Sequence, residues 1–141
     1  MLAHGQLRMH DGAHWEVHLH MNQCYLGRSY IKSKRPGLVD FMDTTPEERE
    51  EFFRIATALR DGLTSLFKPD LFNWATLGNI VRQCHMHFVP RYENSRALEG
   101  VFFTDQNWNK NWAPYDKDWC APDDVTLCIC QLVGEAMLAR L

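Results

Sequence analysis

Residues 79–92 read Asn79-Ile-Val-Arg-Gln-Cys-His-Met-His-Phe-Val-Pro-Arg-Tyr92, and polar and apolar residues alternate through the middle of this stretch. The polar positions are Gln83, His85 and His87, with apolar residues between them and directly after them. Side chains alternate between the two faces of a β-strand, so both imidazoles would share one face while the apolar residues pack behind it. A neutral imidazole near pH 7 can be a nucleophile, a proton carrier or a metal ligand. The pattern therefore indicates a chemical site.

The composition is typical of one globular domain. Of the 141 residues, 45% are hydrophobic and 23% are charged, which favours a folded core over disorder. A net charge of −3 disfavours a general nucleic-acid binder. No apolar run is long enough to span a bilayer, and the first residues lack the apolar core of a signal peptide, so no membrane partner is expected. The five cysteines include no C-x-x-C pair, which favours a reduced, cytoplasmic protein.

Hydrophobic periodicity outlines the elements of this domain, which we expect to cover residues 1–141. Residues 1–13 show no period, and we expect them to be loosely ordered. Alternating or β-rich patterns predict four strands. These strands cover residues 15–22, 25–32, 71–77 and 85–90. A loop is predicted at residues 34–37, and an irregular segment at 93–120.

Two helices are also predicted. Thr45-Pro-Glu-Glu48 is a helix start, because Thr45 can cap the helix, the proline suits the first helical position and Glu48 completes a capping box. Apolar residues then recur at helical spacing from Phe52 to Leu66. A second helix is predicted to begin near residue 122. Because consecutive strands with short connections favour antiparallel pairing, we predict an α+β fold, a small antiparallel sheet with two main helices.

The histidine motif resembles the signature of the histidine triad (HIT) superfamily of nucleotide hydrolases and transferases. That signature is His-φ-His-φ-His-φ-φ, where φ is apolar, and it is often followed by Pro-Arg. Its last part matches as His85-Met-His-Phe-Val-Pro-Arg91, while Gln83 stands at the first triad position. Further segments that resemble a bacterial branch are Cys24-Tyr-Leu-Gly-Arg28, Asn73-Trp-Ala-Thr-Leu-Gly-Asn79, Phe103-Thr-Asp105 and Ala113-Pro-Tyr115. The resemblance covers residues 15–141, which argues against a chance match.

The resemblance implies a HIT-like fold and chemistry at the α-phosphorus of a nucleotide. In the family the middle histidine, here His85, attacks that phosphorus and forms a covalent nucleotidyl-imidazole. His87 would contact a phosphate oxygen and neutralise charge in the transition state. Asn73 and Asn79 stand at about the positions from which relatives contact the phosphate. Dinucleoside polyphosphates, such as diadenosine polyphosphates, and nucleoside phosphoramidates are the implied substrates, with a homodimer and no metal or other cofactor.

Gln83 is the main departure from the family pattern. An amide forms hydrogen bonds but cannot carry a proton at neutral pH, so the preferred leaving group stays open. The substitution also motivates a second hypothesis, a nucleotide-binding sensor or regulatory module with little or no turnover. Many relatives have a further histidine near residues 34–36, and this chain has none there.

Several other residues have two interpretations. His18 and His20 form a second H-x-H, which is either a solvated polar face or, with the triad histidines or Cys24, part of a zinc site. Aromatic residues in the long loop either pin the loop to the domain or stack on a base. These residues are Trp108, Trp112, Tyr115 and Trp119. Arg91 and Arg96 either attract phosphate or are solvated charges. Asn73 and Asn79 are alternatively strand-end and turn residues.

Overall fold

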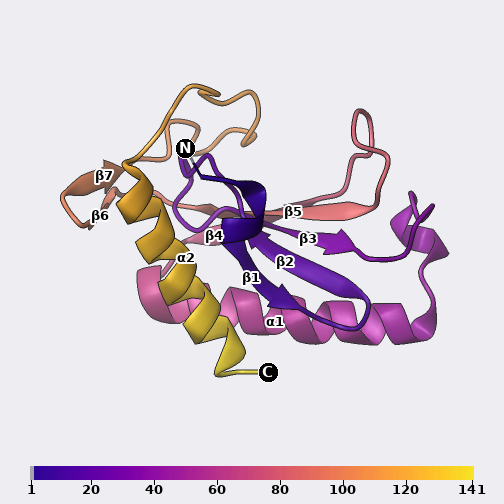
Figure 1. The fold of residues 1–141 in the computed structure, drawn as a ribbon. Coiled ribbons are helices and arrows are strands. Elements are labelled where there is room, and N and C mark those ends of the chain that lie inside the picture. The colour runs from indigo at the N-terminus through magenta and orange to yellow at the C-terminus, as the bar shows by residue number, and fades with distance from the viewer. Residues whose placement is uncertain (1) are drawn as a thin grey trace.

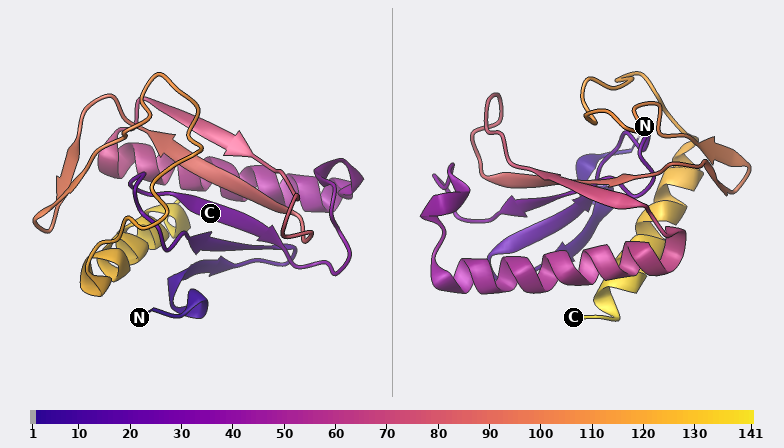
Figure 2. Two further views of the ribbon diagram at one scale, coloured as in Figure 1. Left: turned by 90° about the horizontal axis from the view of Figure 1, so that it is seen from above. Right: turned by 180° about the vertical axis from the view of Figure 1, so that it is seen from behind.

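A computed structural model describes residues 2–141 (Figure 1). Its strands are β1 (Arg8–Asp11), β2 (Trp15–Leu19), β3 (Ser29–Ser33), β4 (Leu71–Ala75), β5 (His85–Arg91), β6 (Arg96–Leu98) and β7 (Val101–Phe103). Its helices are the short 3-10 turns η1 (His4–Leu7) and η2 (Phe41–Asp43), and the α-helices α1 (Pro46–Phe67) and α2 (Asp123–Leu138). Both α-helices lie on one side of the sheet, and the loop after β7 crosses the other side (Figures 1 and 2).

Five strands form one antiparallel sheet in the order β1-β2-β3-β5-β4, and β6 and β7 form a separate hairpin. The predicted α+β fold with two main helices is confirmed. Strand β5, which carries the histidine motif, lies between β3 and β4, so its neighbours come from two distant parts of the chain. The connection between β4 and β5 projects beyond the sheet (Figure 1).

The alternation predicted for the histidine strand is present in β5. Phe88 is 0% exposed and packs in the core between the sheet and the helices, whereas His85 and His87 are half-buried on the opposite face. Most of the other core residues come from β2, β3, α1 and α2. They include Trp15, Val17, Leu19, Ile31, Phe52, Ile55, Leu59, Leu63, Ile129, Val133 and Met137. One face of the sheet therefore stabilises the domain and leaves the other available for chemistry.

Helix α1 begins and ends as the sequence predicts. The Thr45 side chain accepts a hydrogen bond from the Glu48 backbone N–H (3.1 Å), and the Glu48 carboxylate accepts one from the Thr45 backbone N–H (2.8 Å). These two bonds form the expected capping box, with Pro46 at the first helical position. At the other end Lys68 adopts a left-handed conformation with φ of 51°, which stops the helix before Pro69.

Two segments are more ordered than predicted. The expectation of a loosely ordered N-terminal stretch is wrong for residues 4–11, because η1 and β1 form there and Leu7 is only 1% exposed. Met1 lies outside the described residues. The predicted irregular segment at 93–120 contains the hairpin of β6 and β7. Each of these strands has three or four residues, and β1 pairs through a bulge, so neither segment shows a readable alternation.

Strands β2 and β3 are shorter than predicted because a buried glutamine organises their connection. Gln23 is 0% exposed. Its amide nitrogen donates to the carbonyl oxygens of His20 and Arg28, and its amide oxygen accepts from the Gly27 backbone N–H. The backbone between residues 20 and 28 thus bonds to a side chain instead of continuing the strand ladder.

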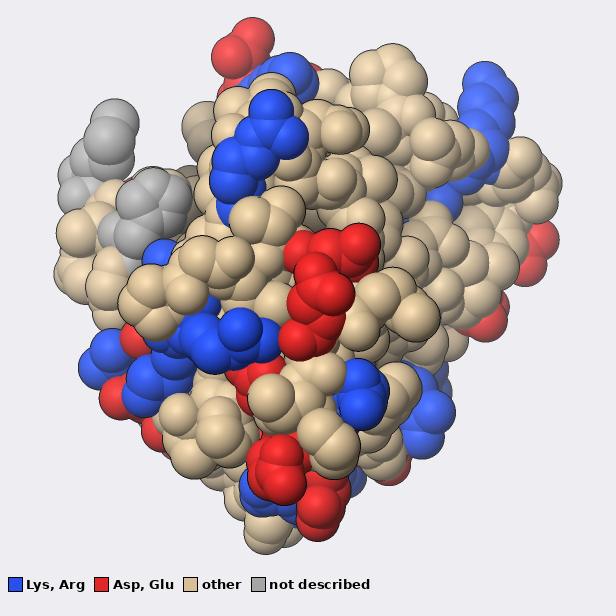
Figure 3. Space-filling model, turned by 90° about the vertical axis from the view of Figure 1, so that its right-hand side faces the viewer, with Lys and Arg blue, Asp and Glu red and all other residues tan. Residues whose placement is uncertain are grey.

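The surface carries mixed charge where it is visible from the end of the sheet. On the face shown in Figure 3, Lys and Arg side chains lie among Asp and Glu side chains, and neither sign dominates. Within residues 2–141, no helix combines the length and the apolar character that crossing a membrane requires.

The capping box gives a direct stability test. We expect Thr45→Ala to lower the free energy of unfolding by about 1 kcal/mol, because the helix loses a side-chain acceptor for an otherwise unbonded N–H. Thr57→Ala, an exposed position within the same helix, is the matched control and should be neutral or slightly stabilising. Urea unfolding of both variants measures the difference. Equal effects of the two changes would contradict the assigned cap.

Candidate active site

His85 is held in one tautomer by its own strand. Its Nδ1 lies 2.8 Å from the backbone carbonyl oxygen of Gln83. A carbonyl oxygen can only accept, so Nδ1 carries the proton and Nε2 of the neutral ring carries the lone pair. The contact also fixes the rotation of the ring. Half-buried His85 therefore presents an oriented nucleophilic nitrogen, on the sheet face opposite the helices.

His87 packs beside His85 in a less polar environment. The two ring centroids are 4.8 Å apart at an angle of 79°, and the Trp112 ring centroid is 5.6 Å from that of His87. Burial, with smaller contributions from His85 and from the positive charge of Arg28, lowers the pKa of His87 to about 4. His87 is therefore neutral near pH 7. Its Nδ1 is buried without a hydrogen-bond partner among the described residues.

The Gln83 side-chain amide links the segment before β5 to the end of β3. Its Nε2 donates to the backbone carbonyl oxygens of Ser33 (2.8 Å) and Arg35 (3.0 Å). Both amide hydrogens are thereby bonded to the last residue of β3 and to the segment that follows it. The structure places Gln83 next to the histidines, as the sequence predicts, but its N–H groups bond to the backbone.

A cavity of about 280 Å³ lies over this part of the sheet. Its lining residues come from strands β3 and β5, from the residue directly after β2 and from the β4–β5 connection. They are His20, Tyr30, Lys32, Val81, Gln83, His85 and His87. In the β3–β5 pair, Tyr30 is opposite His87 and Lys32 is opposite His85, and opposite residues of an antiparallel pair direct their side chains to the same face. The cavity is thus built on the cross-strand neighbours of the two histidines.

Comparison with known proteins relates this arrangement to a family. The HIT domain family matches residues 31–94. A HIT protein from Sinorhizobium meliloti has a TM-score of 0.74 at 18% identity, covering 96% of this chain and 89% of its own. Those from Bradyrhizobium japonicum and Marinobacter aquaeolei have TM-scores of 0.73 and 0.70, each at 18% identity, with 92% and 99% of this chain and 89% and 98% of their own covered. The fold is the HIT fold. The search of curated proteins found no match.

The sequence match to the HIT domain is confined to residues 31–94, whereas the likeness in fold extends over nearly the whole chain. Residues 31–94 run from β3 to the end of the motif strand, so they include most of the cavity lining. The identities of 18% carry the fold and not the choice of substrate, which therefore depends on the residues of this chain.

Arg91, which follows the histidines on β5, holds the loop that crosses this HIT fold. It is 3% exposed and its guanidinium donates to both carboxylate oxygens of Asp105, at 2.7 and 3.1 Å. It also donates to the backbone carbonyl oxygens of Asn107 and Lys110. The sequence suggested that Arg91 is either a phosphate ligand or a solvated charge. The structure instead shows a buried residue that holds the loop. Arg96 is also engaged, because its guanidinium donates to carbonyl oxygens after α1, those of Phe67 and Lys68.

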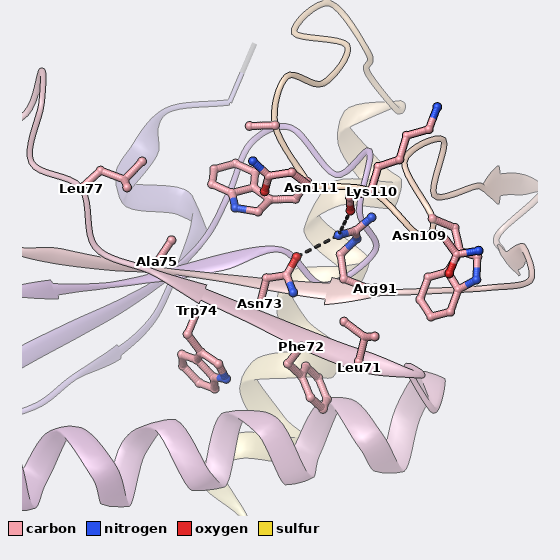
Figure 4. A pocket seen from close by; sticks show the side chains of 13 residues that line it. Leu71, Phe72, Asn73, Trp74, Ala75, Leu77, Arg91, Asn109, Lys110 and Asn111 are labelled. Atoms are coloured by element: carbon pink, nitrogen blue, oxygen red, sulfur yellow. Dashed lines mark hydrogen bonds between the residues drawn. The ribbon is translucent and has the colours of Figure 1, made fainter.

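The two asparagines lie apart from the histidine cavity. A larger cleft of about 760 Å³ follows β4, and Asn73 faces it (Figure 4). The Asn73 side-chain oxygen accepts from Arg91 at 2.8 Å, so it supports the loop anchor. Asn79 is exposed in the β4–β5 connection and lines neither hollow. Since the larger cleft includes neither histidine, we take the smaller cavity as the chemical site. The phosphate roles of Asn73 and Asn79 stay predictions.

Two of the four loop aromatics, Trp112 and Tyr115, pack against a buried cation, as the pinning interpretation predicts. Arg28 is 1% exposed, and its guanidinium carbon lies 4.3 Å from the Tyr115 ring centroid and 5.3 Å from that of Trp112. Its Nη2 donates to the Tyr115 hydroxyl (3.0 Å). These cation–π contacts place Trp112 against His87.

The second H-x-H lies on the same sheet face as the motif histidines. His18 is only 8% exposed, stacks on Tyr30 with centroids 5.0 Å apart, and its Nε2 is 3.1 Å from the Glu16 carboxylate. The interpretation of a solvated face is therefore wrong for His18. Among the side chains that the structure describes, no cluster of three or more His, Cys, Asp or Glu is arranged to hold a metal.

Sequence reasoning did not identify Tyr30 and Lys32 as site residues, and it considered His20 only in the zinc interpretation. The available signal was the strand predicted over residues 25–32, in which Tyr30 and Lys32 alternate with buried Ile31. Recognising them required knowing that this strand pairs with β5 and in which register.

The buried anchor should dominate the stability of the loop. We expect Asp105→Asn to lower the free energy of unfolding by about 3–5 kcal/mol, because it leaves the buried Arg91 charge without a carboxylate. The matched control is Asp61→Asn, which breaks an exposed pair with Arg60 and should cost less than about 1 kcal/mol. Urea unfolding gives both values, and similar small losses would contradict the anchor role.

His87 should titrate far below its ordinary pKa. With a folded pKa of about 4 and an ordinary value of 6.5, the unfolded chain binds the proton more readily. The resulting stabilisation is complete above pH 6.5 and is lost as the pH falls towards 4. NMR titration of the His87 ring should give a midpoint near 4, and a midpoint near 6.5 would contradict the buried, neutral ring.

Proposed function

We propose that the chain is a HIT-family nucleotide hydrolase or nucleotidyl transferase that acts through a covalent nucleotidyl-His85 intermediate. The observation that carries this proposal is the 2.8 Å contact between His85 Nδ1 and the Gln83 carbonyl oxygen. In the neutral ring it makes Nε2 the nitrogen that carries the lone pair, and this ring lines a cavity and is fixed in rotation. A preoriented lone pair is what attack on phosphorus requires.

The reaction has two displacements at the α-phosphorus. In the first, His85 Nε2 forms a bond to phosphorus while the bond to the leaving group breaks, and the leaving group departs with the electron pair. In the second, water or another acceptor attacks the same phosphorus, loses its proton to solvent and releases His85. The nature of this acceptor separates a hydrolase from a transferase. His87 stabilises the negative charge on the phosphoryl oxygens.

Nucleotide substrates are supported by the fold and by one described relative. The solved structure of a Sulfolobus tokodaii protein, described as a hypothetical histidine triad nucleotide-binding protein, has a TM-score of 0.68 at 11% identity. We propose the same small-molecule class for this chain, namely dinucleoside polyphosphates or nucleoside phosphoramidates. A homodimer remains a prediction from the resemblance, and a cytoplasmic location remains a prediction from the cysteine content.

The sensor hypothesis is favoured by one observation, the engagement of Gln83. This side chain cannot deliver a proton to a leaving group, and both its N–H groups already bond to backbone carbonyls. A protein that binds nucleotide without steady product release is therefore the second candidate.

The enzyme proposal is tested by the loss of the nucleophile. We expect His85→Ala to lower turnover of diadenosine polyphosphate by about a thousandfold or more, because no other group forms the covalent intermediate. Intact-protein mass spectrometry should detect a nucleotidyl adduct in the protein without the substitution but not in the variant. His14→Ala, in the β1–β2 connection, is the control and should retain activity.

The outcomes separate the two functions. Turnover with an adduct that His85→Ala abolishes supports the enzyme. Unchanged turnover in His85→Ala would contradict the proposed mechanism. Nucleotide binding without turnover or adduct would favour the sensor.

A further inference from the structure

Lys32 is the only lysine or arginine among the described residues that line the histidine cavity. It lies on β3 directly opposite His85 on β5. In an antiparallel pair, opposite side chains share a face and their Cβ atoms are about 5 Å apart. The positive charge of Lys32 is therefore anchored on the backbone position next to the proposed nucleophile.

The structure shows no hydrogen bond or ion pair between the Lys32 ammonium group and the side chains and backbone groups that it describes. Its neighbour on the other side is Glu16 of β2, the natural candidate for an ion pair. The Glu16 carboxylate instead lies 3.1 Å from His18 Nε2 and 3.7 Å from an Arg8 nitrogen. Lys34, two residues further on, differs because its ammonium is 2.7 Å from the Asp11 carboxylate. Lys32 is thus a cation beside the histidines that the described side chains leave unpaired.

Two other polar groups that line this cavity, Gln83 and Tyr30, limit how a leaving group can depart. Both N–H groups of Gln83 bond to backbone carbonyls. This residue therefore neither protonates a leaving group nor donates a hydrogen bond to it. Tyr30 lines the same cavity, and burial raises the pKa of its phenol, which keeps its proton near pH 7. A leaving group that is stable as an anion needs no proton, but its charge needs compensation.

We propose that Lys32 binds the phosphate groups of the leaving group and selects nucleotides whose leaving group is a phosphate chain. The inference rests on the proposed attack by His85. As the bond from the α-phosphorus to the bridging oxygen breaks, the electron pair passes to a phosphate chain whose charge the Lys32 ammonium offsets. A leaving group without phosphate gains nothing from this contact.

Two adenylyl substrates with different leaving groups test the role. The first is diadenosine tetraphosphate, and the second is the p-nitrophenyl ester of AMP, whose leaving group needs no proton and contains no phosphate. We expect Lys32→Met to lower kcat/KM for the tetraphosphate by about tenfold or more, and for the nitrophenyl ester by less than about twofold. Lys34→Met removes the same charge outside the cavity and should change both values by less than about twofold.

Equal losses on the two substrates, or no loss on either, would overturn the role of Lys32 while leaving the His85 mechanism intact. If the unchanged protein converts neither substrate, the proposed enzyme fails and binding decides the question for Lys32. In that case ADP should bind more tightly than AMP, and Lys32→Met should remove that preference. A preference that survives Lys32→Met, or the absence of any preference, would reject the phosphate contact.

Discussion

The alternation of side chains along β5 is the constraint on which both the core and the candidate site depend. Phe88 enters the core, while His85 and His87 face the other side of the same strand. Because the period of a strand is two residues, a slip of one position would bury the imidazoles and expose the core. Stability and chemistry are therefore coupled through one register, and the strands on either side of β5 hold it. The bond from His85 to the Gln83 carbonyl adds a local restraint, so the tautomer follows from the same backbone geometry.

Contacts between residues far apart in the sequence hold the loop after β7 over this strand. The Arg91–Asp105 pair anchors the loop after β7, and the stacking of Trp112 and Tyr115 on Arg28 carries that loop back over the sheet. Trp112 then helps to enclose His87, whose neutral ring reflects burial more than any single charge. The two buried arginines, Arg28 and Arg91, thus hold the loop against the sheet. The exposed Lys32 is the cation that remains available beside the histidines.

Elements with a strong local signal were predictable. The capping box places the start of α1, and the alternation around the histidines places β5 and its two faces. The α+β class followed from the order of these elements. The short strands β1, β6 and β7 were not predictable, because three or four residues give little periodicity and their stability comes from pairing. The burial of His18 was also not predictable, since its stacking partner Tyr30 lies on a different strand.

By itself the sequence determined the histidine strand, which of its faces is chemical and the resemblance to HIT proteins, because each of these is written in neighbouring residues. Only the tertiary structure decided what surrounds the imidazoles. It paired Arg91 with Asp105 and placed Asn73 in a separate cleft. It also bonded the Gln83 amide to the backbone at the end of β3 and placed Lys32 opposite His85. These pairings join residues 14 to 53 positions apart in the chain. Strand order and register set them, and a side-chain pattern along one segment contains neither.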